Sequence, residues 1–95
     1  MKIPKQVKIG AHLIDIVLTD QTEDFGCFEN KKARIIISKE TKPSLQEETF
    51  FHECLHSIFD QTGVGRGLTD DDEEKMIQPI ANMLYQFLKD NDLLK

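Results

Sequence analysis

The hydrophobic pattern of this chain changes its period at Pro43, and this change limits the fold more than any other feature. Before Pro43, apolar and polar residues alternate, as Ile14 and Ile16 do with Asp15, which is typical of half-buried strands. After Pro43, apolar residues recur every three or four positions, which is the period of an amphipathic helix. Strands followed by helices predict the α+β class.

Three runs in the first part of the chain are predicted to be strands. They are residues 5–9, residues 12–19 and the β-branched run 33–38. Residues 27–29 are expected to pair with the last run as a hairpin. We therefore expect a small antiparallel sheet of three to four strands, with the two helices after it.

The first helix is expected to begin at Ser44, because Ser44 to Glu47 fits the capping-box pattern. It should reach about Gln61 and end at the following glycines. The second helix is expected from Thr69–Asp70 to about Asp90, with Pro79 inside it. Its predicted buried stripe consists of Ile77, Ile80, Ala81, Leu84 and Leu88.

Length and charge restrict the function classes. A chain of 95 residues fits one domain, 1–95, with a thin core to which a metal or a partner can add stability. The net charge is −5: residues 1–42 carry +2 and residues 43–95 carry −7. Without a basic cluster, nucleic acid and anionic membranes are poor partners. No apolar run is long enough to span a membrane. The two cysteines are too few for a disulfide scaffold, and we expect them to be reduced thiols in a cytoplasmic protein.

Residues 52–56 form a complete HExxH motif on the first predicted helix. Residues four apart lie on one helix face, so His52 and His56 can bind one metal ion. Glu53 is rotated by about 100° from His52, beside the metal position. Zinc with an open coordination position activates water, and a neighbouring glutamate can act as the general base. The motif therefore predicts Zn²⁺ at His52 and His56, with Glu53 as the catalytic residue.

A third metal ligand is expected in the acidic run 70–74. Acidic residues in a first helical turn also stabilise the helix dipole, which accounts for most of this run. Glu73 lies in line with the centre of the predicted apolar stripe, and Glu74 lies at its border beside the small Ala81. Because a ligand should face a cleft at the edge of the core, we favour Glu74 and keep Glu73 as the alternative.

With these residues, the chain resembles gluzincin-type zincin metallopeptidases, in which a glutamate on a later helix completes HExxH. It looks most like small phage and prophage zincin-like proteins, distant relatives of the ImmA/IrrE-type metallopeptidases. The resemblance covers roughly residues 8–91 and includes Thr49 and Phe51 before the motif and the ending 84–91. It implies zinc ligands at His52, His56 and Glu74, with Glu53 as general base.

Two function classes follow from these observations. The first is a zinc metallopeptidase acting on a peptide or protein, with residues 33–38 as the strand edge that pairs with an extended substrate. The second is a non-catalytic zinc-binding or protein-interaction module of phage origin. The intact Glu53 favours the first class, and the small size of the chain favours the second. No oxyanion-stabilising group is assigned among His12, Tyr85 and Arg66.

Overall fold

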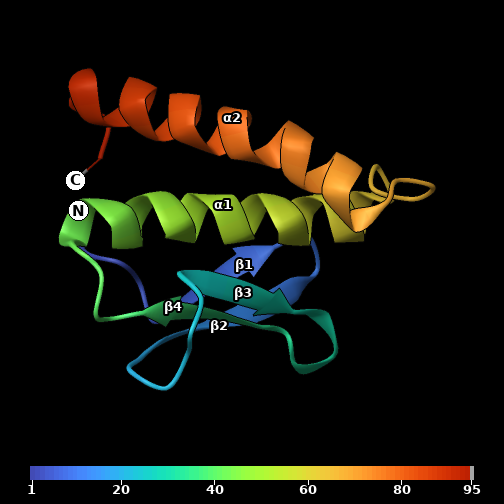
Figure 1. The fold of residues 1–95 in the computed structure, drawn as a ribbon, viewed down its shortest axis with the longest axis horizontal. Helices are drawn as coiled ribbons and strands as arrows, with labels where there is room; N and C mark the ends of the chain where they lie inside the picture. The colour runs from blue at the N-terminus through green and yellow to red at the C-terminus, as the bar shows by residue number, and fades with distance from the viewer. Residues whose placement is uncertain (95) are drawn as a thin grey trace.

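The computed structural model describes residues 1–94, which form a sheet and two helices (Figure 1). The α+β class is confirmed, as is the presence of three to four strands followed by two helices. The elements are β1 (Gln6–Ile9), β2 (His12–Thr19), β3 (Gly26–Glu29), a short 3-10 helix (Asn30–Lys32), β4 (Arg34–Ser38), α1 (Pro43–Thr62) and α2 (Asp70–Asp90).

The sheet is mixed, and this differs from the antiparallel sheet expected from the sequence. Its strand order is β1-β2-β4-β3. The pairs β1–β2 and β3–β4 are antiparallel, but β4 runs parallel to β2, with Ile16 opposite Ile35. The strongly apolar β4 therefore lies inside the sheet, where both of its edges are paired. The prediction that residues 33–38 form a free edge is wrong, because β3 is the edge strand on that side.

The core lies between the sheet and α1. Alternation places Ile14 and Ile16 of β2 on the same sheet face as Ile35 and Ile37 of β4, where Phe50 of α1 packs on them. α1 thus separates the sheet from α2, which forms the outermost layer (Figure 1). Among residues 1–94, no helix covers the side of the sheet opposite α1.

The start of α1 differs from the predicted capping box. Lys42 is the N-cap residue, without a side-chain hydrogen bond, and Pro43 occupies the first helical position. Proline suits that position because its φ is already helical and its missing N–H has no partner to lose. The helix consequently begins before Ser44. It ends at Gly63 with φ of 77°, a left-handed conformation that glycine adopts readily.

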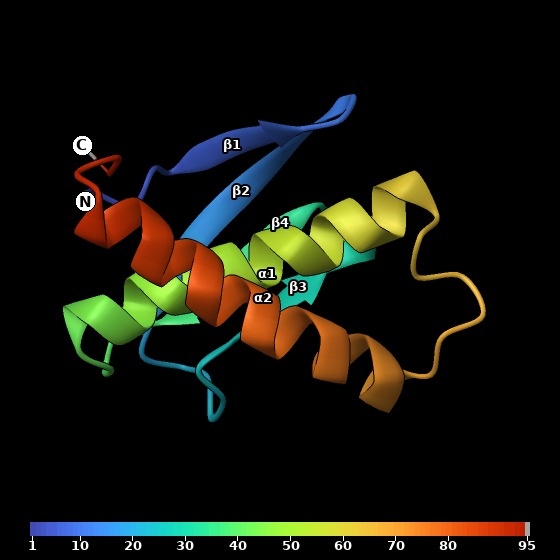
Figure 2. The same ribbon diagram turned by 90° about the horizontal axis from the view of Figure 1, so that it is seen from above.

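α2 returns antiparallel to α1 and crosses over it (Figure 2). Thr69 caps it by accepting a hydrogen bond from the Asp72 amide at 3.1 Å, and the helix continues through Pro79. Its buried residues are Ile77, Ala81 and Tyr85. Ile80, which was expected in the buried stripe, is exposed. Within residues 1–94, neither helix has the combined length and apolar character that crossing a membrane requires.

Candidate metal centre

The two histidines of the motif lie one turn apart on α1, with ring centroids 5.0 Å apart. They face the beginning of α2, where Glu74 projects between them. Glu74 Oε1 lies 2.5 Å from His52 Nε2, and Glu74 Oε2 lies 3.1 Å from His56 Nε2. One carboxylate thus contacts both imidazoles across the two helices.

These three residues could hold a metal ion. One donor atom from each of His52, His56 and Glu74 can be chosen so that all lie within 4.8 Å of one another. Donors of a tetrahedral zinc site with bonds of about 2.0–2.1 Å lie roughly 3.3 Å apart, so small side-chain movements suffice to meet that spacing. Two imidazoles and one carboxylate are also a donor set that zinc accepts. The residues therefore fit zinc, although the set suits other divalent metals as well.

Burial favours the form of His52 that binds metal. Desolvation lowers the pKa of His52, an effect that the charge of Glu74 opposes and the nearby His56 reinforces. A lowered pKa keeps the imidazole neutral at neutral pH, and the neutral ring has the lone pair that a metal ion requires.

Glu73 contacts the opposite side of the His56 ring from Glu74. Its Oε2 lies 3.3 Å from His56 Nδ1, while His56 Nε2 faces Glu74. A histidine that binds metal through one nitrogen commonly donates the other N–H to a carboxylate, which fixes the tautomer and the ring orientation. The two neighbouring glutamates thus differ in position: Glu74 belongs to the three-residue group, and Glu73 stands behind one of its members.

Glu53 lies beside the group and is enclosed by protein. Its Oε2 is 4.0 Å from His52 Nε2, and the residue is 7% exposed. Burial raises the pKa of Glu53 to about 7, with further contributions from Glu74 and Asp24. The charge of His56 and a hydrogen bond from the Phe28 backbone amide act in the opposite direction. The carboxylate is therefore placed between the motif helix and β3.

Gly26 allows this close approach of α1 to β3. A Cβ atom at Gly26 would lie 2.6 Å from the Ile36 carbonyl oxygen and 2.7 Å from Thr49 Cγ2. Thr49 lies on α1, one turn before Glu53. Only a glycine therefore lets the helix lie this close to the strand and bury Glu53 against it.

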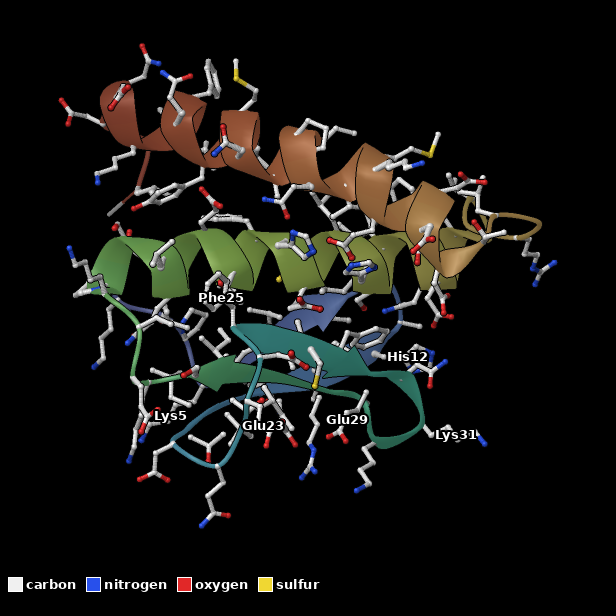
Figure 3. The ribbon with its side chains drawn as sticks, in the orientation of Figure 1. Lys5, His12, Glu23, Phe25, Glu29 and Lys31 are labelled. Carbon is white, nitrogen blue, oxygen red and sulfur yellow. The ribbon has the colours of Figure 1, made fainter. Side chains whose placement is uncertain are left out.

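The remaining candidates from the sequence lie outside this group. His12 is exposed at the far end of the sheet (Figure 3). Tyr85 is buried and donates a hydrogen bond to Glu47 at 3.0 Å. Burial raises the pKa of Cys54 to about 12, as expected for an inert thiol rather than a ligand. Arg66 is exposed, but it lines the cavity next to the site.

A cavity of about 690 Å³ opens beside the three-residue group, within the usual size range of ligand sites. It lies between α1, β3 and the loop that joins the helices. Its lining includes Cys27, Phe28, Glu53, His56, Asp60, Arg66, Asp70, Glu73 and Glu74. A smaller cavity of about 280 Å³ lies on the other side of Glu53 and is lined by His52 and Glu48, among others.

Comparison of the chain with protein-family models, with curated proteins and with solved structures finds no match. The sequence indicated the four side chains His52, Glu53, His56 and Glu74, which the structure brings together. The sequence did not indicate the contact of Glu53 with the backbone amide of Phe28. Every residue type except proline has a backbone N–H, so the residue type at position 28 gives no signal for this contact.

Proposed function

We propose that this chain is a zinc-dependent metallopeptidase-like protein that hydrolyses a peptide bond, with His52, His56 and Glu74 as the metal ligands. The observation that carries the proposal is the convergence of three donors from two helices, with a fourth side chain, the carboxylate Glu53, beside them and outside the group. A purely structural metal site has no use for that additional carboxylate.

Zinc, when bound, supplies Lewis acidity that lowers the pKa of a water molecule and polarises a carbonyl group. Glu53 accepts the proton of the attacking water at its carboxylate and delivers it to the leaving amine. The hydrogen bond from the Phe28 amide holds that carboxylate in place. Its burial between α1 and β3 excludes bulk water from it. Glu73 orients the His56 ring through Nδ1.

Within residues 1–94, β3 offers an exposed strand edge beside the site for an extended substrate segment. β3 is an edge strand of the sheet, and its Phe28 amide faces Glu53. Edge strands bind extended peptides by backbone pairing. We therefore place the substrate along β3, instead of along residues 33–38, with the 690 Å³ cavity receiving its side chains.

The ligand assignment can be tested with two neighbouring variants. Purified protein should contain about one zinc per chain. Glu74→Gln should lose most of that zinc, whereas Glu73→Gln should retain it with affinity reduced by roughly 10–100-fold, the usual effect of an outer carboxylate. The reverse pattern would make Glu73 the ligand, and retention of zinc by both variants would contradict the three-residue site.

Catalysis can be tested with Glu53→Gln, which fills the same space but cannot accept the proton. This variant should keep its zinc, and new protein termini should appear in a cell lysate incubated with wild type but not with the variant. Absence of differing termini, with zinc bound to both proteins, would refute the peptidase proposal.

The alternative function is a non-catalytic zinc-binding or protein-interaction module. Absence of differing protein termini would support this alternative. For either function we propose a cytoplasmic setting and phage or prophage origin. The first is consistent with two cysteines that remain free thiols, and the second depends on the resemblance alone.

A further inference from the structure

The second helix has a second apolar face that points away from α1. Met76, Ile80, Met83 and Phe87 are 47%, 48%, 61% and 53% exposed. With about 100° of rotation per residue, these four side chains lie within a sector of roughly 60°. They form a continuous apolar line on the outer side of α2, which we call the outer stripe.

The outer stripe is unusual for a helix at the surface of a small domain. Such helices carry polar residues opposite the buried face, which in α2 consists of Ile77, Ala81 and Tyr85. A single exposed apolar residue needs no explanation, but a contiguous line of them marks an interaction surface. α2 is the outermost layer, so none of the elements in residues 1–94 covers this side (Figures 1 and 3).

We propose that the outer stripe binds a second copy of this chain, with the two α2 helices antiparallel about a two-fold axis. A two-fold interface uses the same surface on both chains, so its pattern must match itself when reversed. The spacing of the stripe is four, three and four residues, which is the same from either end. Antiparallel packing sets Met76 opposite Phe87 of the second copy, and Ile80 opposite Met83.

Charge selects the antiparallel orientation. α2 begins with five consecutive acidic residues, 70–74. Parallel helices would bring two such runs together, and their repulsion would oppose association. Antiparallel helices separate the runs by about the length of a 21-residue helix, roughly 30 Å, and align the helix dipoles favourably.

The area of the stripe indicates a weak dimer. Four side chains that are about half exposed present roughly 400 Å² per chain, and the pair together with its polar rim reaches about 1,000 Å². This is near the lower limit for specific association, so we expect a dissociation constant in the micromolar range. Because the stripe faces away from α1, the dimer leaves His52, His56 and the cavity beside them accessible.

Analytical ultracentrifugation between about 5 and 500 μM tests the proposal. The 11.0 kDa chain should change from monomer to dimer over this range. Ile80→Asp should remain monomeric throughout. The control is Leu13→Asp, on the sheet and 58% exposed, which should dimerise as the wild type does. Association should persist in a chelator, which separates it from the proposed metal site.

A wild-type protein that is monomeric at 500 μM would overturn the proposal. The outer stripe would then be a binding surface for a different protein. Equal weakening by Ile80→Asp and Leu13→Asp would also overturn it, because the dimer would then not depend on the outer stripe. Dimerisation that disappears in a chelator would assign the association to metal instead.

Discussion

Replacing Glu53 by glutamine should remove the pH dependence that this buried carboxyl gives to the stability of the metal-free protein. In the folded chain the pKa of Glu53 is raised from 4.5 to about 7, chiefly by burial. The folded state therefore binds a proton more tightly than the unfolded state does. Between about pH 4.5 and pH 7 stability must fall as the pH rises, because folding then requires a buried charge or an added proton.

The size of the effect follows from the size of the shift. Two and a half pKa units, at about 1.4 kcal/mol each, give roughly 3 kcal/mol above pH 7. Glutamine has no charge to bury, so Glu53→Gln should gain up to about 3 kcal/mol relative to wild type between pH 4.5 and pH 8. The lowered pKa of His52 affects stability in the opposite sense, but His52 is present in both proteins and largely cancels in the difference.

The measurement is chemical denaturation of both proteins in a chelator at several pH values from 4.5 to 8. Glu23→Gln, an exposed carboxylate in the loop before β3, is the control for loss of a surface charge. The titratable side chains around Glu53 are His52, His56, Glu74 and Asp24. A Glu53→Gln difference that stays constant over this range, or that falls as the pH rises, would refute burial as the dominant influence on Glu53.

Three further perturbations test other parts of the structure. Zinc at 100 times its dissociation constant should stabilise the wild type by about 2.7 kcal/mol and the His52→Ala variant much less. Thermal melts with and without a chelator measure this, and an equal shift of the melting temperature in both proteins would contradict the site. Gly26→Ala should destabilise the chain by about 1–3 kcal/mol, because the new methyl group meets Thr49, whereas an unchanged denaturation midpoint would show that α1 can move aside. In a Cys27→Ser variant, native Cys54 should react with a thiol reagent at pH 8 at least about a hundredfold more slowly than after unfolding, since its pKa is about 12. Comparable rates in the two states would show that the thiol is accessible.

The sequence predicted the type of each element better than the pairing of the strands. The change of period at Pro43 is a local signal, and strand or helix follows from it directly. Pairing depends on contacts between distant residues. The parallel contact between β2 and β4 arises because the apolar run Ile35–Ile37 is most stable inside the sheet, with β3 folded back on its outer edge. An uninterrupted apolar run was itself a sign of an interior strand.

The choice between Glu73 and Glu74 illustrates the limit of a helical projection. The spacing of His52 and His56 alone places both on one face of α1. α2 has two apolar faces, the buried one towards α1 and the exposed outer stripe. The predicted stripe combined Ile80 of the exposed face with Ile77 of the buried face. Only the packing of α2 on α1 determines which carboxylate reaches both rings. The outer stripe is thus also the reason why the buried face was assigned imperfectly.

Glu74, the proposed ligand, and Glu53, the proposed general base, differ in their access to water, and this difference separates their proposed roles. Glu74 is half exposed at 50%, so water reaches its carboxylate, at the open edge of the site where a metal ion would enter. Glu53 is enclosed between α1 and β3, where burial favours its protonated form. Two neighbouring carboxyl groups that differ this much in burial are suited to different chemical roles. That division depends on Gly26, because a larger residue there would push α1 away from β3 and admit water to Glu53.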